Sequence, residues 1–486
     1  MRRVPWVVGL VALAAGLRLV RLGTWDIGLD EAYSALVAAR PLPDLVAFVA
    51  RDDFHPPLYY VFLHFWRSVA GNDEFWLRFP NVVFGSAAVP VVYALGRELV
   101  DERTALVAAL LFALSPLHVF HAQDLRMYAL LLLLGSCALL CFVRGLRDGR
   151  AADWALHTGF LVLALYTHYG AFLLLAGEAL ALAWVWAARR VLPLRAWITS
   201  VGAALAGFSP WAFVLLQHLG RTGPPEVPGS ALLPLQQVAY ALVAFASDFL
   251  PPGRPVLKAV ILLGSGGATL YGSWILRRRP ESAAALVGTS LGALGIAAIA
   301  GLRFQAISVG TYVLIPRTLL LASIGYLVLL GVAAVHLRPR PVGWTLLGAL
   351  VALNLFSLPR VYLGPRPLWG PWRSVAAYVA ERVQPGDGIV VVSGHWARPF
   401  EFYFSSHAKP VRFVRYYGRQ DLERVHELVR GSRRVWLVSR QPESVDPRGR
   451  VRTHLRSAMH PISSVSFETG VRVEGYAGTI PTRAFW

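Results

Sequence analysis

The chain has 486 residues, of which 56% are hydrophobic and only 15% charged, and it carries a net charge of +19. This composition excludes an ordinary soluble globular protein and indicates a chain that crosses a membrane several times. The positive charge does not indicate a nucleic-acid-binding protein, because the arginines stand in short groups between apolar runs and form no single basic face. Membrane lipids and phosphate-bearing molecules are the partners that such a charge favours.

Apolar runs long enough to cross a bilayer recur from the N-terminus to about residue 358. A hydrocarbon core roughly 30 Å thick needs about 20 apolar residues in a helix, and the sequence predicts about eleven such spans. They are 4–22, 80–98, 104–120, 127–143, 153–169, 171–188, 197–217, 256–276, 283–302, 317–335 and 342–358. The first run has the charged start of a signal peptide but no convincing cleavage site, so we expect it to remain as the first span.

Basic residues fix the predicted orientation of these spans. Lys and Arg collect in short cytoplasmic loops, and a cytoplasmic N-terminus places every strongly basic short connection inside. These connections contain Arg2 and Arg3, Arg97 and Arg103, Arg144, Arg147 and Arg150, Arg189, Arg190 and Arg195, Arg277, Arg278 and Arg279, and Arg338 and Arg340. The first outer loop, 23–79, the loop 218–255 and everything after about 359 are then expected on the extracytoplasmic side.

The first outer loop contains two segments that we expect to lie in the membrane interface. The stretch "DEAYSALVAARPLPDLVAFVA" (30–50) has apolar residues at helical spacing. The stretch "PPLYYVFLHFWRSVAG" (56–71) is short and begins with two prolines, and as a true span it would move every later basic loop to the outside. Together the two segments are predicted to form a platform over the mouth of a cavity.

Carboxylates and a histidine stand at the starts of these two segments. Asp30 and Glu31 begin the first segment, where they either belong to a functional cavity or complement the dipole of a new helix. Both interpretations stay open for Glu31. The stretch "RDDFHPPLYY" (51–60) adds Asp53 and His55, and the histidine there is suited to bind a metal, donate to a phosphate or cap a helix.

Further ionisable residues occur in the later outer turns. The stretch "SPLHVFHAQDLRMYAL" (115–130) is the richest, and charged groups at the end of apolar spans normally face a cavity or a partner, with an Asp124–Arg126 pair as the simpler alternative. His168, flanked by tyrosines in "LYTHYGAF", also fits an aromatic interface belt. Arginines in the last turns suit a phosphate as bidentate donors. The candidates are His118, His121, Asp124, Arg126, Tyr128, His168, Tyr169, Arg303 and Arg317.

Three charged residues within the spans have less definite roles. Arg18 and Arg21, near the outer end of the first span, either join a phosphate site or extend toward the interface. Glu178 lies in the middle of a span, and the sequence identifies no partner for it.

The composition changes after Leu358. The runs "GIVVVSG" (388–394) and "RVWLVSR" (434–440) are typical of short buried strands. The stretches 372–383 and 419–431 have the spacing of amphipathic helices. A small extracytoplasmic α/β domain over residues 361–486 is therefore expected.

The order and spacing of several motifs resemble the GT-C superfamily of membrane glycosyltransferases, of the family 39 (protein mannosyltransferase) and aminoarabinose-transferase type. These motifs are the acidic pair of the first loop, "HPPLYY", "HAQDLRMYAL", "YTHYGA" and "YVLIPRTLL" (312–320), and the likeness runs through about the first 335 residues. The resemblance implies a mostly α, polytopic GT-C helix bundle over residues 1–360, placed in the cell membrane with the N-terminus in the cytoplasm. The C-terminal domain is covered only loosely.

The resemblance also implies an activity. Such enzymes transfer a sugar from a polyprenyl-phosphate donor to a lipid, glycan or protein acceptor on the outer face, which would serve glycosylation in the cell envelope. Asp30 would be the catalytic carboxylate, Glu31 its neighbour and Asp124 a second acid. Contacts to substrate would come from His55, Arg126, Tyr128, His168, Tyr169, Arg303 and Arg317.

A divalent metal ion is a candidate cofactor, with His55, Asp53 and His168 as its candidate ligands. Some relatives have an acid and then a lysine before the proline pair, where this chain has Phe54 and His55. Three other functions remain open: a glycan ligase that uses a diphosphate carrier, a lipid or solute transporter or flippase, which would need broken helices near the midplane, and a non-catalytic assembly subunit.

Overall fold

The computed structural model describes residues 4–189, 194–221, 233–303, 316–364, 370–392, 397–405 and 410–478. The contacts of the chain divide it into two compact units. We call Met1–Leu22 with Pro41–Gly364 the bundle unit, and Gly23–Arg40 with Pro365–Trp486 the α/β unit. The first outer loop is thus shared between the two units.

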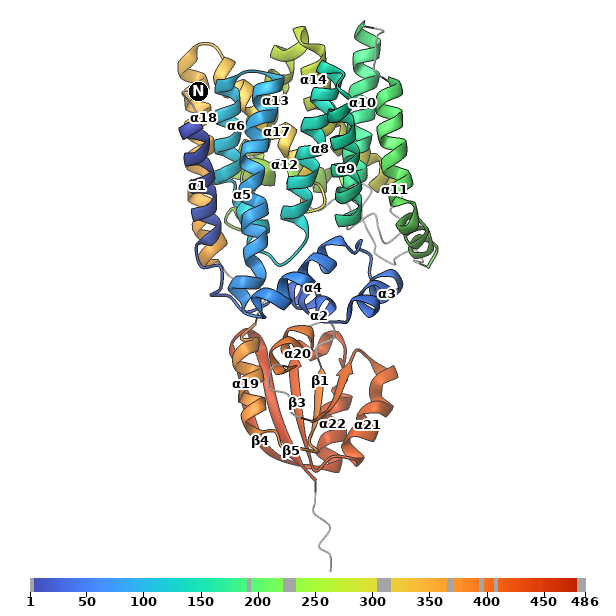
Figure 1. The fold of residues 1–486 in the computed structure, drawn as a ribbon. Helices are drawn as coiled ribbons and strands as arrows, with labels where there is room; N and C mark the ends of the chain where they lie inside the picture. Colours follow the sequence, from blue (N-terminus) through green and yellow to red (C-terminus); the bar gives the residue numbers. More distant parts are fainter. Residues whose placement is uncertain are drawn as a thin grey trace, which may run out of the picture. The chain divides into compact units, whose positions relative to one another are not determined.

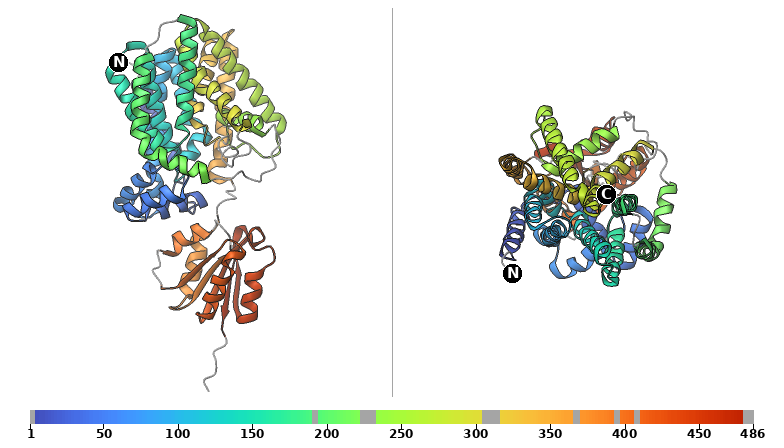
Figure 2. Two further views of the ribbon diagram at one scale, coloured as in Figure 1. Left: turned by 90° about the vertical axis from the view of Figure 1, so that its right-hand side faces the viewer. Right: turned by 90° about the horizontal axis from the view of Figure 1, so that it is seen from above.

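The bundle unit consists of helices, most of which run along a common direction, while α3 and α4 lie across one end (Figure 1; Figure 2, right). In chain order they are α1 (Val4–Leu19), α3 (Leu42–Asp52), α4 (Leu58–Ala70), α5 (Glu74–Leu99), α6 (Glu102–Leu114), α7 (Pro116–Ala122), α8 (Tyr128–Asp148), α9 (Ala151–Thr167), α10 (Ala171–Arg189), α11 (Leu194–Arg221), α12 (Leu233–Ala246), α13 (Pro255–Ile275), α14 (Pro280–Val287), α15 (Ala293–Arg303), α17 (Leu320–His336) and α18 (Arg340–Leu363).

Within the described residues, six helices are long and apolar enough to cross a membrane, or up to seven if the bent pair α6 and α7 is one span. Each of the predicted spans coincides with one or more helices. The count of about eleven is not confirmed, because several of these helices are shorter than the bilayer requires. Several apolar helices of this length are typical of a multi-pass membrane protein.

Three predicted elements differ from the structure. The segment 30–50 is not one helix: α2 (Leu29–Ala38) ends before Pro41, and α3 begins at Leu42, because proline lacks the N–H that a continuous helix needs. The predicted span 104–120 bends by 57° between α6 and α7, where Pro116 begins the new helix. The predicted loop 218–255 contains helix α12.

The buried Arg18 side chain stabilises the break between α6 and α7. Its Nη1 donates to the carbonyl oxygens of Ala14 at 3.1 Å and Ala113 at 3.2 Å, and the residue is fully buried. Ala113 belongs to the last turn of α6, whose carbonyls lose their helical partners at Pro116. Arg18 therefore satisfies a helix end, and neither of the two roles expected from the sequence applies to it.

Glu178 has a partner that the sequence did not identify. Its Oε1 lies 3.1 Å from Nε2 of His157, and both side chains are fully buried. The indole of Trp197 donates to Oε2 at 3.1 Å, and the second nitrogen of His157 lies 2.8 Å from the hydroxyl of Ser200. This group connects α9, α10 and α11, and a carboxylate inside a bundle needs such partners because burial disfavours an unpaired charge.

The α/β unit contains a five-stranded sheet with helices on its faces (Figure 1; Figure 2, left). Its elements are α2, α19 (Trp372–Arg382), β1 (Gly388–Val392), α20 (Ala397–Ser405), β2 (Arg412–Tyr416), α21 (Leu422–Arg430), β3 (Arg434–Arg440), α22 (Arg450–Ala458), β4 (His460–Ser466) and β5 (Val471–Ala477). The order is β2-β1-β3-β5-β4, in which the pairs β2-β1 and β1-β3 are parallel and the pairs β3-β5 and β5-β4 are antiparallel. The predicted strands and helices of this region are confirmed.

The centre of this sheet is buried on both faces. All five residues of β1 are buried, as expected for a parallel strand with helices above and below. Val390 and Leu437, which are paired in the register, pack with Val425 and Leu455 from α21 and α22. The unit therefore has a hydrophobic core of its own.

Candidate functional site

Asp53 and His55 form the first part of the candidate site, in the turn between α3 and α4. Asp53 caps the end of α3 in an extended conformation, and its side chain is buried. Its Oδ1 accepts hydrogen bonds from the backbone N–H of His55 at 3.1 Å and from Nδ1 of the same residue at 3.0 Å. The carboxylate therefore fixes the orientation of the imidazole.

Arg126 holds the other side of this imidazole. Its Nη2 lies 3.3 Å from Nε2 of His55, and its Nη1 donates to the Tyr60 hydroxyl at 3.5 Å. A guanidinium only donates, so Nε2 of His55 accepts and the ring proton is on Nδ1, facing Asp53. Asp53, His55, Tyr60, Arg126 and the adjacent His168 are called the His55 cluster below.

The pKa of Asp53 reflects this environment. Burial alone would raise it, but the hydrogen bond from His55, the charge of Arg126 and a bond from Tyr60 outweigh burial and lower the pKa to about 2. Asp53 is therefore ionised at any physiological pH. Its role in the cluster is to accept hydrogen bonds and balance the charge of Arg126.

The backbone of the Arg126 turn is held by Asn81 of α5. The amide Nδ2 of this fully buried residue donates to the carbonyl oxygens of Asp124 and Arg126 and to the Tyr59 hydroxyl at 2.9 Å. Asn81 was not among the site residues predicted from the sequence. The signal that could have identified it is a single polar residue near the start of an apolar run. The carboxylate of Asp124 lies 3.9 Å from Nδ1 of His121.

His168 and Tyr128 extend the cluster. The His168 ring lies 5.7 Å, centre to centre, from both the His55 and the Tyr128 rings, and Tyr128 lies 4.9 Å from the ring of His121. Nδ1 of His168 accepts from the backbone N–H of Gly170 at 2.9 Å. Burial, together with the charges of the neighbouring cations, lowers the pKa of His168 well below its usual value. His168 is therefore neutral.

Tyr169 lies beside the cluster, in the turn between α9 and α10. Its hydroxyl accepts a hydrogen bond from the indole of Trp211 at 3.2 Å. Burial raises its pKa to about 12 and outweighs the hydrogen bond from Trp211, which lowers the pKa, while the charge of Asp53 makes a smaller contribution that also raises it. The tyrosine therefore remains a neutral hydrogen-bonding group.

Of the two arginines predicted in the last outer turn, the structure describes the side chain of only one. Arg317 is half-buried just before α17, and its charge is among those that lower the pKa of His168. Arg303 ends helix α15, and its side chain lies outside the described residues. The bundle unit thus brings together the predicted residues Asp53, His55, His121, Asp124, Arg126, Tyr128, His168, Tyr169 and Arg317. His118 instead lies between the hydroxyls of Ser115 and Ser323 in the core of the bundle.

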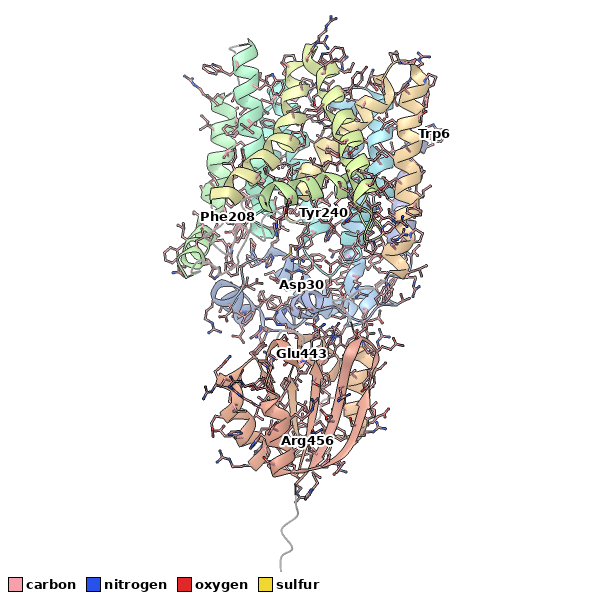
Figure 3. The ribbon with its side chains drawn as sticks, turned by 180° about the vertical axis from the view of Figure 1, so that it is seen from behind. Trp6, Asp30, Phe208, Tyr240, Glu443 and Arg456 are labelled. Carbon is pink, nitrogen blue, oxygen red and sulfur yellow. The ribbon has the colours of Figure 1, made fainter. Side chains whose placement is uncertain are left out.

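Asp30 and Glu31 belong to the α/β unit, on helix α2. Asp30 is labelled in Figure 3. Oε2 of Glu31 accepts a hydrogen bond from the backbone N–H of Gly28 at 2.8 Å, and its side chain is buried. This is the helix-start role that the sequence left open for Glu31. Asp30 is half-buried, and its carbonyl oxygen accepts from the Ser34 hydroxyl at 3.1 Å.

Helix α2 is attached to α20 of the same unit. The backbone N–H of Ile27, directly before the helix, donates to the Tyr403 hydroxyl at 2.7 Å. The guanidinium of Arg398 lies 4.4 Å from the centre of the Tyr33 ring, a favourable cation–π distance. The position of Asp30 is therefore determined by side chains of the C-terminal region.

The three predicted metal candidates do not fit a divalent cation. Nε2 of His55 already accepts from Arg126, and Nδ1 carries the proton shared with Asp53. The lone pair on Nδ1 of His168 faces the Gly170 N–H, and the guanidinium charge of Arg126 would repel a metal. In the part of the chain that the structure describes, no group of three or more His, Cys, Asp or Glu side chains is placed to hold a metal ion.

Part of the chain matches a known protein family. Residues 54–214 match the model of the dolichyl-phosphate-mannose-protein mannosyltransferase family. No curated protein matches the chain in sequence. The matched segment begins just before the "HPPLYY" motif and includes Asn81, Arg126 and His168.

Solved structures resemble the chain over nearly its whole length. ArnT from Cupriavidus metallidurans in the apo state has a TM-score of 0.65 at 14% identity, with 98% of each chain covered. The same protein bound to undecaprenyl phosphate has a TM-score of 0.67, again at 14% identity and 98% coverage of each chain.

The oligosaccharyltransferase AglB from Archaeoglobus fulgidus, in complex with an inhibitory peptide and a dolichol-phosphate, has a TM-score of 0.54 at 13% identity. That match covers 98% of this chain and 75% of AglB. The chain has the fold of ArnT, and its resemblance to the GT-C glycosyltransferases is confirmed.

Proposed function

We propose that this protein is an integral membrane glycosyltransferase that moves a sugar from a polyprenyl-phosphate-linked donor to an acceptor hydroxyl on the extracytoplasmic face. One similar ArnT structure is bound to undecaprenyl phosphate and the similar AglB structure to a dolichol-phosphate, and both ligands are polyprenyl phosphates. The distribution of arginines supports a cytoplasmic N-terminus and an outward-facing site.

The arrangement of Arg126 carries the proposal. This buried guanidinium is held by Tyr60 and His55, and the ionised Asp53 balances its charge. A leaving phosphate gains negative charge as its bond to the sugar breaks, and a positioned arginine stabilises that charge without reorganisation. Arg317 supplies a second positive charge near His168.

The proposed reaction is a single displacement that uses Asp30 as the general base. The carboxylate of Asp30 accepts the proton of the acceptor hydroxyl, and the oxygen forms a bond to the anomeric carbon of the sugar. The bond from that carbon to the phosphate oxygen breaks, and its electron pair leaves with the polyprenyl phosphate. A single displacement of this kind inverts the configuration at the anomeric carbon.

The remaining residues hold or surround the substrate. Tyr128, His168 and Tyr169 present neutral hydrogen-bonding groups and aromatic faces suited to a sugar ring. Asp124 is the second acid, suited to bind sugar hydroxyls. Glu31 fixes the start of the helix that carries Asp30.

The decisive experiment measures release of polyprenyl phosphate from several polyprenyl-phosphate sugars by the purified protein. Turnover by the wild type that is lost in Asp30→Asn and kept in Asp44→Asn supports the proposal, because Asp44 is an exposed acid in the first turn of α3. Turnover only with a diphosphate-linked glycan would identify a ligase. Movement of the lipid across vesicles with no release of phosphate would identify a transporter and contradict the proposal.

A further inference from the structure

A cavity of about 350 Å³ lies in the bundle unit, away from the candidate site. It is formed where α6 begins, where α17 ends and where α18 begins. The candidate site lies at the opposite ends of these helices, since the pair α6 and α7 leads to the Arg126 turn and Arg317 precedes α17. Its ionisable lining residues are Asp101, Glu102, Arg103, His336, Arg338 and Arg340.

The two acids in this cavity already have partners. Asp101 accepts from the backbone N–H of Thr104 at 2.9 Å, and its other oxygen lies 2.8 Å from Nε2 of His336. Although burial raises the pKa of Asp101, these contacts outweigh it and keep the pKa below the usual value. Glu102 accepts from the Tyr93 hydroxyl at 3.3 Å.

The three arginines of the cavity are in a different state. Within the described residues, none of them forms an ion pair or side-chain hydrogen bond, and all three are exposed. By contrast, Arg144 and Arg147 at the end of α8 share the carboxylate of Glu98. The cavity therefore gathers three guanidiniums whose charge no carboxylate of the described chain neutralises.

Lipid-facing residues adjoin the cavity. Val342 and Trp344, in the first turns of α18, are 46% and 67% exposed, and α18 is one of the helices able to span a membrane. Trp6, 67% exposed, lies toward the same end of the bundle (Figure 3). Exposed tryptophans are typical of the membrane–water interface, so the cavity opens at the depth of lipid headgroups.

We propose that this cavity binds the phosphate of an anionic phospholipid headgroup from the adjoining leaflet, through Arg103, Arg338 and Arg340. The planar fork of a guanidinium matches two phosphate oxygens, and basic pockets between membrane helices are suited to anionic headgroups. The acyl chains would lie along the exposed apolar surface that includes Val342 and Trp344. The proposal is independent of the glycosyltransferase reaction.

Native mass spectrometry of the detergent-purified protein tests the site, with phosphatidylglycerol, phosphatidylcholine or inorganic phosphate added at equal concentrations. We expect bound phosphatidylglycerol, weak binding of phosphatidylcholine, and a loss of affinity of roughly tenfold or more in R103Q/R338Q/R340Q. The matched control, R97Q/R277Q/R278Q, removes the same charge from arginines outside the cavity. R103K/R338K/R340K, which keeps the charge, is expected to retain part of the binding.

Three results would overturn the proposal. If the cavity variant and the matched control lost phosphatidylglycerol binding equally, the lipid would be attracted to the basic surface in general and not to the cavity. Equal binding of phosphatidylcholine would remove the requirement for a net negative headgroup. Displacement of phosphatidylglycerol by inorganic phosphate at similar concentration would identify a site for a soluble anion. A melting temperature near that of the wild type shows that each variant is folded.

Discussion

Helix α2 and the turn from Asp53 to Pro57 belong to one loop of the sequence but are held by different parts of the molecule. The N-terminal end of α2 is fixed by Tyr403 of the α/β unit. The turn is fixed by Arg126 of the bundle unit. The two segments of the predicted platform therefore belong to different units, and each has its own supporting contacts.

The two regions also differ in what they offer chemically. The turn offers the buried guanidinium of Arg126 and the imidazole of His55 beside the ionised carboxylate of Asp53, whose Oδ1 accepts two hydrogen bonds from His55. Helix α2 offers Asp30, next to a carboxylate that caps the helix. In the proposed reaction, proton transfer belongs to α2 and phosphate binding to the His55 cluster, and the following variants test that division.

Asp30→Asn should have the largest effect. Loss of a general base lowers turnover by roughly a thousandfold, while the Michaelis constant for the donor should change little. Steady-state release of polyprenyl phosphate measures both quantities. If Asp53→Asn or Asp124→Asn were more damaging to turnover than Asp30→Asn, the base would have to be assigned to the bundle unit.

Arg126→Gln should have the second-largest effect. Turnover should fall roughly a hundredfold, because one hydrogen-bond donor to the leaving phosphate is lost. A weaker apparent affinity for the donor should accompany this loss. Arg51→Gln, which removes an exposed arginine paired with Asp52, is the control. Kinetics of Arg126→Gln equal to those of the control would show that this guanidinium does not contact the substrate.

Because Asp53 is ionised in the folded protein, the free energy of unfolding of the bundle unit should fall at low pH. Its pKa is lowered from 3.8 to about 2 on folding, so its contribution of about 2 kcal/mol is present above pH 4 and is lost as the pH falls toward 2. About half should be lost by pH 3. Thermal unfolding in detergent between pH 7 and pH 3 should show a steeper decline for the wild type than for Asp53→Asn.

Asp52→Asn is the control for this pH dependence, since Asp52 is an exposed carboxylate next to Asp53 in the sequence. The same decline in the wild type and in Asp53→Asn would show that other groups determine the acid sensitivity.

Tyr403→Phe should have the smallest effect, a decrease in turnover of about fivefold, because one buried hydrogen bond at the start of α2 is lost. Tyr403 is a positioning residue, so turnover should fall without a change in the Michaelis constant for the donor or in the shape of the pH profile. Tyr378→Phe, in α19, removes a hydroxyl that has no hydrogen bond within the described residues. Equal kinetics for the two variants would show that α2 needs no such support.

The sequence predicted those parts of the fold that depend on residues close together in the chain. Apolar runs identified the helices, and the change in composition after Leu358 identified the α/β region with two of its strands. The break at Pro116 and the two helices around Pro41 were missed because apolar spacing continues across both prolines. Helix α12 was missed because its apolar run is short, at 14 residues.

The site was predicted as a set of residues but not as a structure. His55, Arg126 and His168 were selected because each is costly at a membrane boundary, yet nothing local relates His55 to Arg126 across 71 positions. The same limit applies to Asn81 and the Arg126 turn, and to His157 and Glu178. The attachment of α2 to the C-terminal region could not be predicted either, because its contacts join distant parts of the chain.

That attachment has a consequence for biosynthesis. Ile27 and Tyr403 are 376 positions apart, so a chain growing at about 5–20 residues per second makes the partner of α2 on the order of tens of seconds after α2 itself. All the helices of the bundle unit except α1 are synthesised in that interval. Helix α2 thus waits for strands and helices that form only after the bundle, and the carboxylate of Asp30 is held in place only once they have folded. A nascent chain that ends before Tyr403 would therefore lack the hydrogen bond that holds the start of α2.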